Sequence, residues 1–272
     1  MEPRLSETNV RERLKNIKAF VIDQDGTTYL ENQTFSWTRD FLNGLDQKGI
    51  RYLFLSNNSS KSRNEHCKKL ISSGVNVTEE QILSSSDATI EYLKTQPGHK
   101  DIYLLATPSV ENDYKNEGFN IDAEQPNYVV LAYDLTLTFD KLDKACQLVR
   151  NGVTFLATHE DNNWMIGPNQ HRPDVGALAA AITTSTKVKP KFIGKPNAEM
   201  VDAFLARLQL SKDQIAIIGD RMNTDIRMGQ EHDILSFLVL SGKTKAEDVA
   251  ASPFQPDFVV DKTIDILDFL EN

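Results

Sequence analysis

The 272-residue chain contains only two cysteines and no long apolar run. Cys67 and Cys146 lie in separate helix-like stretches and in no metal-ligand spacing, so the sequence favours neither a disulfide framework nor a zinc site. No run of about 18 apolar residues can span a bilayer, and residues 1–18 lack the apolar segment of a signal peptide. We therefore expect a cytoplasmic protein in a reducing compartment, with no membrane partner.

Positive charge is also scarce, with 30 Lys and Arg against 39 Asp and Glu and a formal net charge of −9. Sequence-independent binding to nucleic acid needs clustered positive charge, so we expect no nucleic-acid partner. Phosphorylated small molecules are negatively charged as well. A chain this acidic can bind them only where a local cation or a metal ion reverses the field.

Apolar residues, by contrast, make up 40% of the chain, which is enough to form a packed core. Short apolar runs that end in polar residues predict buried strands, and apolar side chains at helical spacing follow several of them. The predicted strands of this group lie at residues 19–22, 52–55, 215–218, 237–240 and 258–260. The alternation of strands and helices predicts an α/β fold with a parallel sheet.

The middle of the chain has strands and helices of its own between residues 102 and 183. Afterwards the chain returns to strands that end in polar or acidic residues, so we predict that the middle is a second α/β domain inserted into the first. The expected division assigns residues 1–84 and 189–272 to a parallel-sheet core and residues 85–188 to the inserted domain.

Polar side chains follow the predicted strands of the core or stand at the start of a predicted helix. Ligands of open α/β sheets bind outside the carboxyl ends of the strands, so residues at these ends converge in space although they are distant in sequence. We expect such a convergence for Asp23 and Asp25, Ser56, Lys195, and Asp220 with Asp225.

Asp23 and Asp25 are separated only by Gln24 and are followed by Gly26. Such a pair can place one carboxylate on a metal and leave the other to transfer protons. A carboxylate can also attack a phosphoryl group itself and form an aspartyl-phosphate. The alternative is an Asx-type turn through Asp25 and Gly26 that only reverses the chain.

Ser56 supplies a hydroxyl at a strand end, and the polar residues after it begin a helix predicted over 59–73. The backbone N–H groups of a helix N-terminus bind anions. Plain N-capping by Asn58, Ser59 or Ser60 is the alternative.

Lys195 stands between a glycine and a proline, just before a helix predicted over 197–208. It can supply the missing positive charge, although most lysines are solvated surface residues. Mg²⁺ prefers one or two carboxylates together with water and other oxygens, and Asp23, Asp220 and the backbone carbonyl of Asp25 offer such a set.

Four motifs in this order resemble those of the haloacid dehalogenase-like (HAD) hydrolases, and among them the NagD-like and p-nitrophenylphosphatase-like phosphatases with a class IIA cap. The motifs lie at residues 23–27, 55–59, 194–196 and 219–225. The resemblance covers nearly the whole chain. It implies a Rossmann-like core with an inserted α/β cap domain that governs substrate choice, and it implies contacts between the caps of a homodimer.

The resemblance also implies a role for each residue of the motifs. Asp23 would be the nucleophile, and Asp25 would protonate the leaving oxygen and then activate water. The phosphoryl group would be held by Ser56, Asn57 and Lys195. Mg²⁺ would be held by Asp23, the Asp25 carbonyl and Asp220, with Asp225 orienting Lys195 or the waters of the metal. Gln24 departs from the family, which has an apolar residue there, and its side chain is expected to point away from the metal.

Substrate choice is expected from the cap, in the loop at residues 158–164. His159 and Asp161 are our candidates for it. A solvated loop histidine is the alternative for His159. Trp164 suits packing within the cap as well as it suits stacking on a ligand.

The resemblance thus implies a Mg²⁺-dependent phosphatase that hydrolyses small phosphorylated metabolites, such as a sugar phosphate or a nucleotide, through an aspartyl-phosphate. A phospho-accepting receiver-type signalling protein uses a similar acidic cluster with a lysine, but it explains neither the length of the chain nor an aspartate at position 25. A catalytically silent binding protein is disfavoured because no catalytic position is lost.

Overall fold

The computed structural model describes residues 12–30, 33–167 and 170–270. Residues 1–11, which belong to the stretch where we predict no signal peptide, lie outside the described residues. The described chain forms two compact units. The first takes in the described parts of 1–56 and 204–272 together with 67–83, and the second takes in 57–66 and the described part of 84–203.

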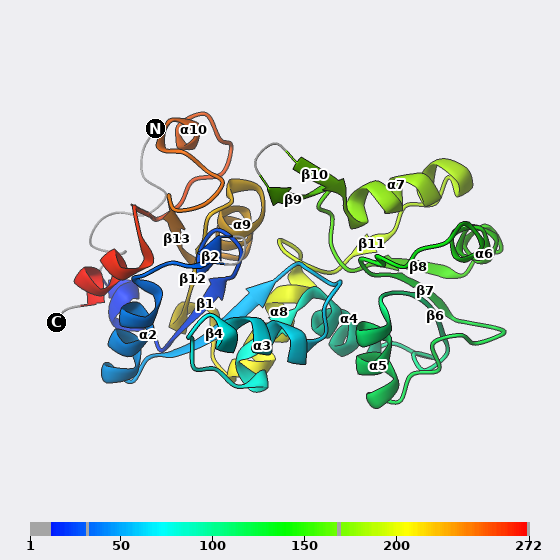
Figure 1. Cartoon of the computed structure of the whole chain (residues 1–272), viewed down its shortest axis with the longest axis horizontal. Coiled ribbons are helices and arrows are strands. Elements are labelled where there is room, and N and C mark those ends of the chain that lie inside the picture. Colours follow the sequence, from blue (N-terminus) through cyan, green and yellow to red (C-terminus); the bar gives the residue numbers. More distant parts are fainter. Residues whose placement is uncertain (1–11, 31–32, 168–169, 271–272) are drawn as a thin grey trace. The chain divides into compact units, whose positions relative to one another are not determined.

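The first unit is built on a six-stranded sheet, with strands in the order β14, β13, β12, β1, β4 and β5 (Figure 1). Its strands are β1 (Ala19–Asp23), β4 (Arg51–Ser56), β5 (Ile82–Ser84), β12 (Ile215–Gly219), β13 (Leu235–Val239) and β14 (Phe258–Val260). The central strand β1 pairs in parallel with both β4 and β12, so that Ile22 lies opposite Phe54 and Ile218. The predicted parallel sheet is confirmed.

Both faces of this sheet are buried, which is why its strands read as nearly continuous apolar runs. All five residues of β1 are buried, and alternate side chains point to opposite faces. Phe20 and Ile22 share a core with Phe41 and Leu45 of α2 (Thr38–Gln47). The rings of Phe20 and Phe41 meet edge to face, with their centroids 6.4 Å apart.

Shorter elements complete this part of the chain. Two helices, α3 and α8, contain residues of both units. The helical and strand segments are α3 (Arg63–Ser72), α8 (Ala198–Leu208), α9 (Arg227–His232), α10 (Ala246–Val249), 3₁₀ turns at Glu79–Gln81, Lys212–Gln214 and Thr263–Leu270, a π-helix at Met222–Ile226, and the paired strands β2 (Tyr29–Leu30) and β3 (Gln33–Thr34).

The second unit has a four-stranded sheet of its own, in the order β11, β8, β7 and β6, and a separate antiparallel pair, β9 and β10. Its elements are α4 (Ser85–Lys94), β6 (Ile102–Leu105), α5 (Pro108–Asn116), β7 (Tyr128–Leu131), α6 (Phe139–Arg150), β8 (Thr154–Ala157), β9 (Asn163–Gly167), β10 (Gln170–Pro173), α7 (Val175–Thr186) and β11 (Lys191–Phe192). The prediction that the middle of the chain has an α/β structure with its own sheet is confirmed.

Alternation along β7 builds two cores, one on each face of the smaller sheet. Val129 and Leu131 pack with side chains of α6 and α7, whereas Tyr128 and Val130 pack with side chains of α4 and α5. The second unit also includes residues 57–66 and 189–203. The assignment of 85–188 to an inserted substrate-specificity domain stays a prediction.

One predicted helix begins later than expected. The sequence predicts a helix over 59–73, but α3 starts at Arg63. The Ser62 N–H donates to Glu65 Oε2 at 2.8 Å and the Glu65 N–H donates to Ser62 Oγ at 3.2 Å, so this pair caps the helix reciprocally. The expected helix start at residue 59 and the alternative N-cap at Asn58, Ser59 or Ser60 are therefore wrong.

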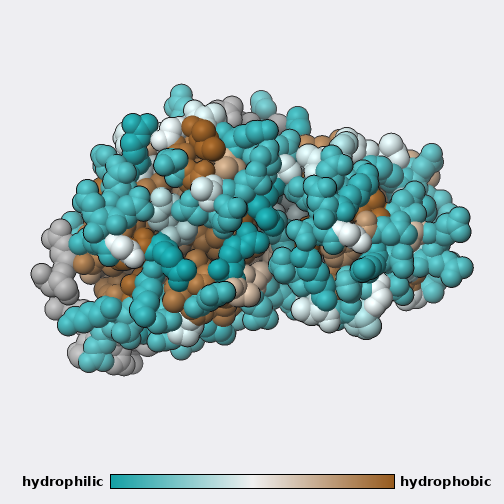
Figure 2. Space-filling view, turned by 90° about the horizontal axis from the view of Figure 1, so that it is seen from below, coloured by the Kyte–Doolittle hydropathy of each residue, from teal (hydrophilic) through white to brown (hydrophobic). Residues whose placement is uncertain are grey.

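The remaining expectations from composition concern the surface and the cysteines. Both cysteines are buried free thiols. Among the residues that the structure describes, no helix combines the length and the apolar character needed to cross a membrane. Hydrophilic side chains predominate on the face drawn in Figure 2, with smaller hydrophobic areas between them.

We expect Phe237→Ala to lower the free energy of unfolding by about 3–5 kcal/mol, because its fully buried ring contacts the rings of Phe20 and Phe258. Ile71→Ala is the control, since that side chain is 52% exposed, and its effect should stay within about 0.5 kcal/mol. Urea unfolding followed by circular dichroism measures both. Equal destabilisation by the two variants would contradict the assigned core.

Candidate active site

The loop after β1 holds its shape through its own backbone. The Thr28 N–H donates to the Gln24 carbonyl at 2.9 Å, and the Gly26 N–H donates to the Tyr29 carbonyl at 2.7 Å. The Thr28 hydroxyl donates to the carbonyl of Asp23 at 2.9 Å. The chain therefore turns at Asp25 and Gly26.

Three carboxylates meet at the carboxyl ends of β1 and β12. Asp23 is the last residue of β1, Asp220 follows the last residue of β12, and Asp225 lies in the π-helix. One oxygen from each side chain lies within 4.8 Å of the others, and all three residues are buried. The parallel pairing of β1 with β12 brings the first two together, and the helical turn after β12 returns the third to the same place.

Asp220 is held closely by the loop after β13. The Lys243 N–H donates to Asp220 Oδ2 at 2.6 Å, and the Thr244 N–H donates to its carbonyl at 3.2 Å. A Cβ atom at Gly26 or at Gly242 would collide with the Asp220 carboxylate. Only glycine fits at these two positions, so the backbone itself forms the walls around this carboxylate.

The three carboxylates could together hold a metal ion, because buried like charges at this separation repel one another unless a cation joins them. The convergence of Asp225 with Asp220 was expected from the strand ends, and the resemblance implied an orienting role for Asp225. The structure brings its carboxylate into the cluster itself. Asp225 Oδ2 accepts from the Arg221 N–H and from the Thr224 hydroxyl, both at 3.3 Å.

Asp25 lies apart from this cluster, and its side chain is 39% exposed. Its Oδ2 lies 3.4 Å from the Tyr29 hydroxyl, and its Oδ1 lies 3.7 Å from Lys69 Nζ. Burial, together with the carboxylates of Asp25 and Asp23, raises the pKa of Tyr29 well above its usual value, so this hydroxyl stays a donor. Gln24 is fully buried, and its Oε1 accepts from the Tyr29 hydroxyl at 3.1 Å.

Ser56 ends β4 and is buried. Because Leu55 lies opposite Asp23 in the register of β4 against β1, Ser56 stands one residue beyond the partner of Asp23 at the same edge of the sheet. Strand pairing therefore places Ser56 at the edge of the sheet where Asp23 ends β1.

Asn57 gathers two other predicted residues within the second unit. Its Oδ1 accepts from the Lys195 N–H at 2.9 Å, and its Nδ2 donates to the Lys195 carbonyl at 3.2 Å and to Asp161 Oδ2 at 2.9 Å. Lys195 is only 3% exposed, so the alternative that it is a solvated surface lysine is wrong. Pro196, joined to it by a cis peptide bond, precedes α8.

His159 lies in a loop but is buried, so the alternative of a solvated loop histidine is wrong. Its Nε2 lies 2.9 Å from Asp174 Oδ1, and its Nδ1 lies 3.2 Å from the Thr158 hydroxyl. Trp164 lies in β9 and packs edge-on against Tyr133, with ring centroids 5.9 Å apart, as expected for packing within the cap.

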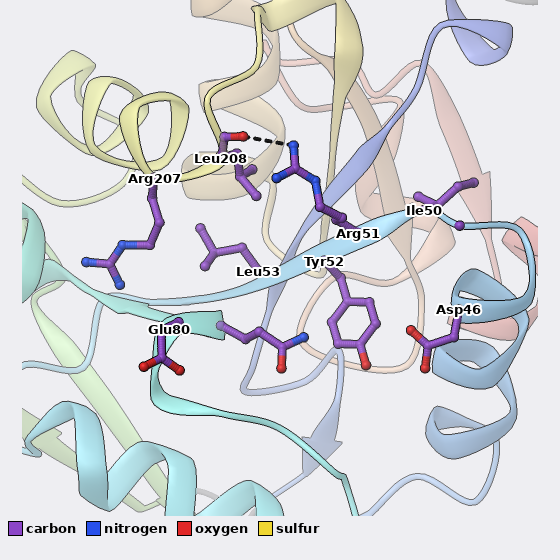
Figure 3. Close-up of a pocket in the computed structure, with 10 residues that line it drawn as sticks. Asp46, Ile50, Arg51, Tyr52, Leu53, Glu80, Arg207 and Leu208 are labelled. Carbon is purple, nitrogen blue, oxygen red and sulfur yellow. Dashed lines mark hydrogen bonds between the residues drawn. The ribbon is translucent and has the colours of Figure 1, made fainter.

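A separate hollow of about 390 Å³ lies at the opposite edge of the larger sheet (Figure 3). Arg51, which begins β4, donates to the Leu208 carbonyl at 2.8 Å on its rim. Arg51 pairs with Ala19 at the start of β1, whereas Ser56 ends β4 about 16 Å farther along the strand. None of the predicted site residues lines this hollow, so it is not the place of the predicted chemistry.

Two family models match the chain. A model described as haloacid dehalogenase-like hydrolase matches residues 20–120. A second, described as HAD-hydrolase-like, matches residues 192–266. The two matches contain the acidic residues at the ends of β1 and β12.

Relatives and solved structures match nearly the whole chain. An acid sugar phosphatase of Staphylococcus saprophyticus is 30% identical over 259 residues, which cover 95% of this chain and 100% of the relative. The structure of 4-nitrophenylphosphatase from Thermotoga maritima has a TM-score of 0.91 and 36% identity, covering 95% of this chain and 99% of that one. NagD from Escherichia coli K-12 has a TM-score of 0.85 and 28% identity, covering 91% and 97%.

These matches cover both compact units, so they account for the smaller sheet as well as the larger one. A receiver-type domain or a silent binding protein does not account for likeness to phosphatases over this length. The chain belongs to the haloacid dehalogenase-like hydrolase family, in its NagD-like and p-nitrophenylphosphatase-like branch, and is a phosphomonoester hydrolase.

Proposed function

We propose that this hydrolase is a Mg²⁺-dependent phosphatase of small phosphorylated metabolites, with sugar phosphates and nucleotides as the substrate classes to test first. The observation that carries the proposal is the cluster of three buried carboxylates at the carboxyl ends of β1 and β12. Such a cluster suits a hard cation and a phosphate oxygen. Two of its relatives, an acid sugar phosphatase and a 4-nitrophenylphosphatase, support the substrate class.

The first half of the reaction would use Asp23 as the nucleophile. One of its carboxylate oxygens attacks phosphorus, the bond from phosphorus to the leaving oxygen breaks, and Asp25 gives its proton to that oxygen. The products are the free alcohol and an aspartyl-phosphate. The separation of Asp25 from the carboxylate cluster supports this division of labour, because its carboxyl group is left to move a proton.

The second half would release the phosphate. Asp25, now a carboxylate, takes a proton from a water molecule, the water oxygen attacks phosphorus, and the bond to the Asp23 oxygen breaks. Inorganic phosphate leaves, and both aspartates return to their starting forms. Splitting the displacement into two steps lets one acid–base residue serve both.

Asp23, Asp220 and the carbonyl of Asp25 would hold Mg²⁺, with Asp225 contributing its carboxylate or orienting the waters. When bound, the ion would neutralise charge on the phosphoryl oxygens. The walls around the Asp220 carboxylate support this, because they hold it in one orientation.

Ser56, Asn57 and Lys195 would bind the transferring phosphoryl group. Burial of Lys195 supports this role, since a lysine that is 3% exposed needs anionic partners. The double contact of the Asn57 amide with the backbone of Lys195 supports a rigid phosphate-binding segment.

Asp161 and His159 remain our candidates for substrate choice by the cap, residues 85–188. The bond from Asn57 Nδ2 to Asp161 Oδ2 supports a link between phosphate binding and the cap loop. The bond of His159 to Asp174 supports an indirect role, in which the histidine shapes the loop.

The expected homodimer would form through the cap. Phe139, at the start of α6, is 80% exposed and Leu135 is 49% exposed. Apolar side chains exposed to this degree support a surface that a second copy covers.

A cytoplasmic location is also part of the proposal. It is supported by the two buried free thiols, because disulfides form and persist in oxidising compartments.

Asp23→Asn should lower the rate of phosphate release by more than about 1,000-fold, since an amide is not a nucleophile toward phosphorus. Acid quenching of the wild type with substrate, followed by peptide mass spectrometry, should find a phosphoryl group on Asp23 that the variant lacks. Asp46→Asn, an exposed carboxyl of α2, is the control and should keep full activity. Turnover of the Asp23→Asn variant at the wild-type rate would contradict the assignment of Asp23 as the nucleophile.

Chelation should abolish phosphate release, and added Mg²⁺ should restore it, because the carboxylate cluster binds phosphate oxygens only through a cation. Calorimetric titration with Mg²⁺ gives a readout without substrate. Asp220→Asn should weaken Mg²⁺ binding at least about tenfold, or about 1.4 kcal/mol, while Asp46→Asn should not change it. Activity that survives excess chelator, or an unchanged binding isotherm, would refute the metal role.

A further inference from the structure

The carboxyl group of Asp25 is held on both oxygens by residues outside the expected catalytic set. Lys69 Nζ lies 3.7 Å from Oδ1, and the Tyr29 hydroxyl lies 3.4 Å from Oδ2. The last torsion of an aspartate side chain is broad and has no sharp preference of its own. A partner on each oxygen is therefore what gives this half-exposed carboxyl one orientation.

Tyr29 is itself anchored on three sides. Its hydroxyl donates to Gln24 Oε1 at 3.1 Å, its backbone carbonyl accepts from the Gly26 N–H at 2.7 Å, and its side chain is buried. The hydroxyl has one proton, which the oxygens of Gln24 and Asp25 share. Gln24 thus fixes the ring whose hydroxyl faces Asp25.

Lys69 contacts both Asp25 and Tyr29. It comes from α3 and is 20% exposed, and its Nζ lies 3.6 Å from the centroid of the Tyr29 ring. A cation over the face of an aromatic ring is attracted by the ring quadrupole. The ring therefore steadies the ammonium group that pairs with Asp25, and the ammonium group in turn covers the ring.

We propose that Gln24, Tyr29 and Lys69 form a brace, a set of positioning residues that holds the Asp25 carboxyl in line with the leaving oxygen. The proposal rests on the proposed role of Asp25 as the acid of the first half-reaction. General acid catalysis contributes about 10²–10⁴-fold and requires the carboxyl within hydrogen-bond reach of its target. A buried Gln24 between the two aspartates then has a function, because its amide oxygen fixes Tyr29.

The test compares two substrates that differ in their leaving group, phenyl phosphate and p-nitrophenyl phosphate. Phenolate is a poor leaving group and needs a proton, whereas p-nitrophenolate is a much weaker base and leaves with less help. The constant kcat/KM covers the steps up to departure of the leaving group, so it reports the acid role of Asp25.

Tyr29→Phe and Lys69→Met should each lower kcat/KM about tenfold for phenyl phosphate and less than about threefold for p-nitrophenyl phosphate. Gln24→Leu should also lower the ratio of kcat/KM for phenyl phosphate to kcat/KM for p-nitrophenyl phosphate. Lys69→Arg, which keeps the cation, should bring this ratio most of the way back to the wild-type value. Because both substrates are measured on one preparation, a misfolded fraction cancels from the ratio.

Lys68→Met is the matched control, since it removes an exposed lysine one position earlier in α3, and its ratio should equal that of the wild type. Equal losses on both substrates in Tyr29→Phe and Lys69→Met would overturn the brace and leave a structural role only. Asp25→Asn separates this from the proposed function. If that variant also treats the two substrates alike, the acid role of Asp25 fails; if it discriminates and the brace variants do not, only the brace fails.

Discussion

The parallel pairing of β1 with β12 on one side and β4 on the other is the constraint on which the candidate site depends. Strands that run in the same direction end at the same edge of the sheet, so polar residues at their ends come together whatever their separation in sequence. Asp23 and Asp220 meet in this way, and Ser56 stands at the same edge. The apolar strands thus do more than fill the core, because their register sets the spacing of the site.

Three buried carboxylates within 4.8 Å of one another carry an electrostatic cost that the surrounding backbone reduces. N–H donors from Lys243 and Arg221 reach Asp220 and Asp225, and glycine at position 242 leaves room for the carboxylate. Residual repulsion favours a divalent cation. The net charge of −9 therefore says little about phosphate binding, since the local sign would depend on a bound cation and on neighbouring basic side chains.

In the second unit, one side-chain amide makes several hydrogen bonds at once. Asn57 makes hydrogen bonds with both backbone groups of Lys195 and with the carboxylate of Asp161. One amide has an acceptor and two donors, so it can bind a carbonyl, an N–H and a carboxylate at once. The proposed brace of Gln24, Tyr29 and Lys69 uses a second amide in the first unit, again to orient a side chain with a proposed catalytic role.

The apolar runs and the polar residues at their ends could be read from the sequence because strands buried on both faces have a local signature. That signature located β1, β4 and β12, the α/β class, and the residues Asp23, Ser56 and Asp220. One helix with a strong local pattern was also predicted closely, since the range expected over 197–208 corresponds to α8, Ala198–Leu208.

Features set by contacts between distant residues had no such signature. The burial of His159, for example, depends on its pairing with Asp174, 15 residues farther along the chain. Lys69 reaches Asp25 from a helix more than forty residues away in sequence. By itself the sequence determined the central strands of the larger sheet, the family and the candidate residues for the proposed chemistry. The tertiary structure alone decided which neighbours surround these residues, because those contacts depend on packing between segments that are remote along the chain.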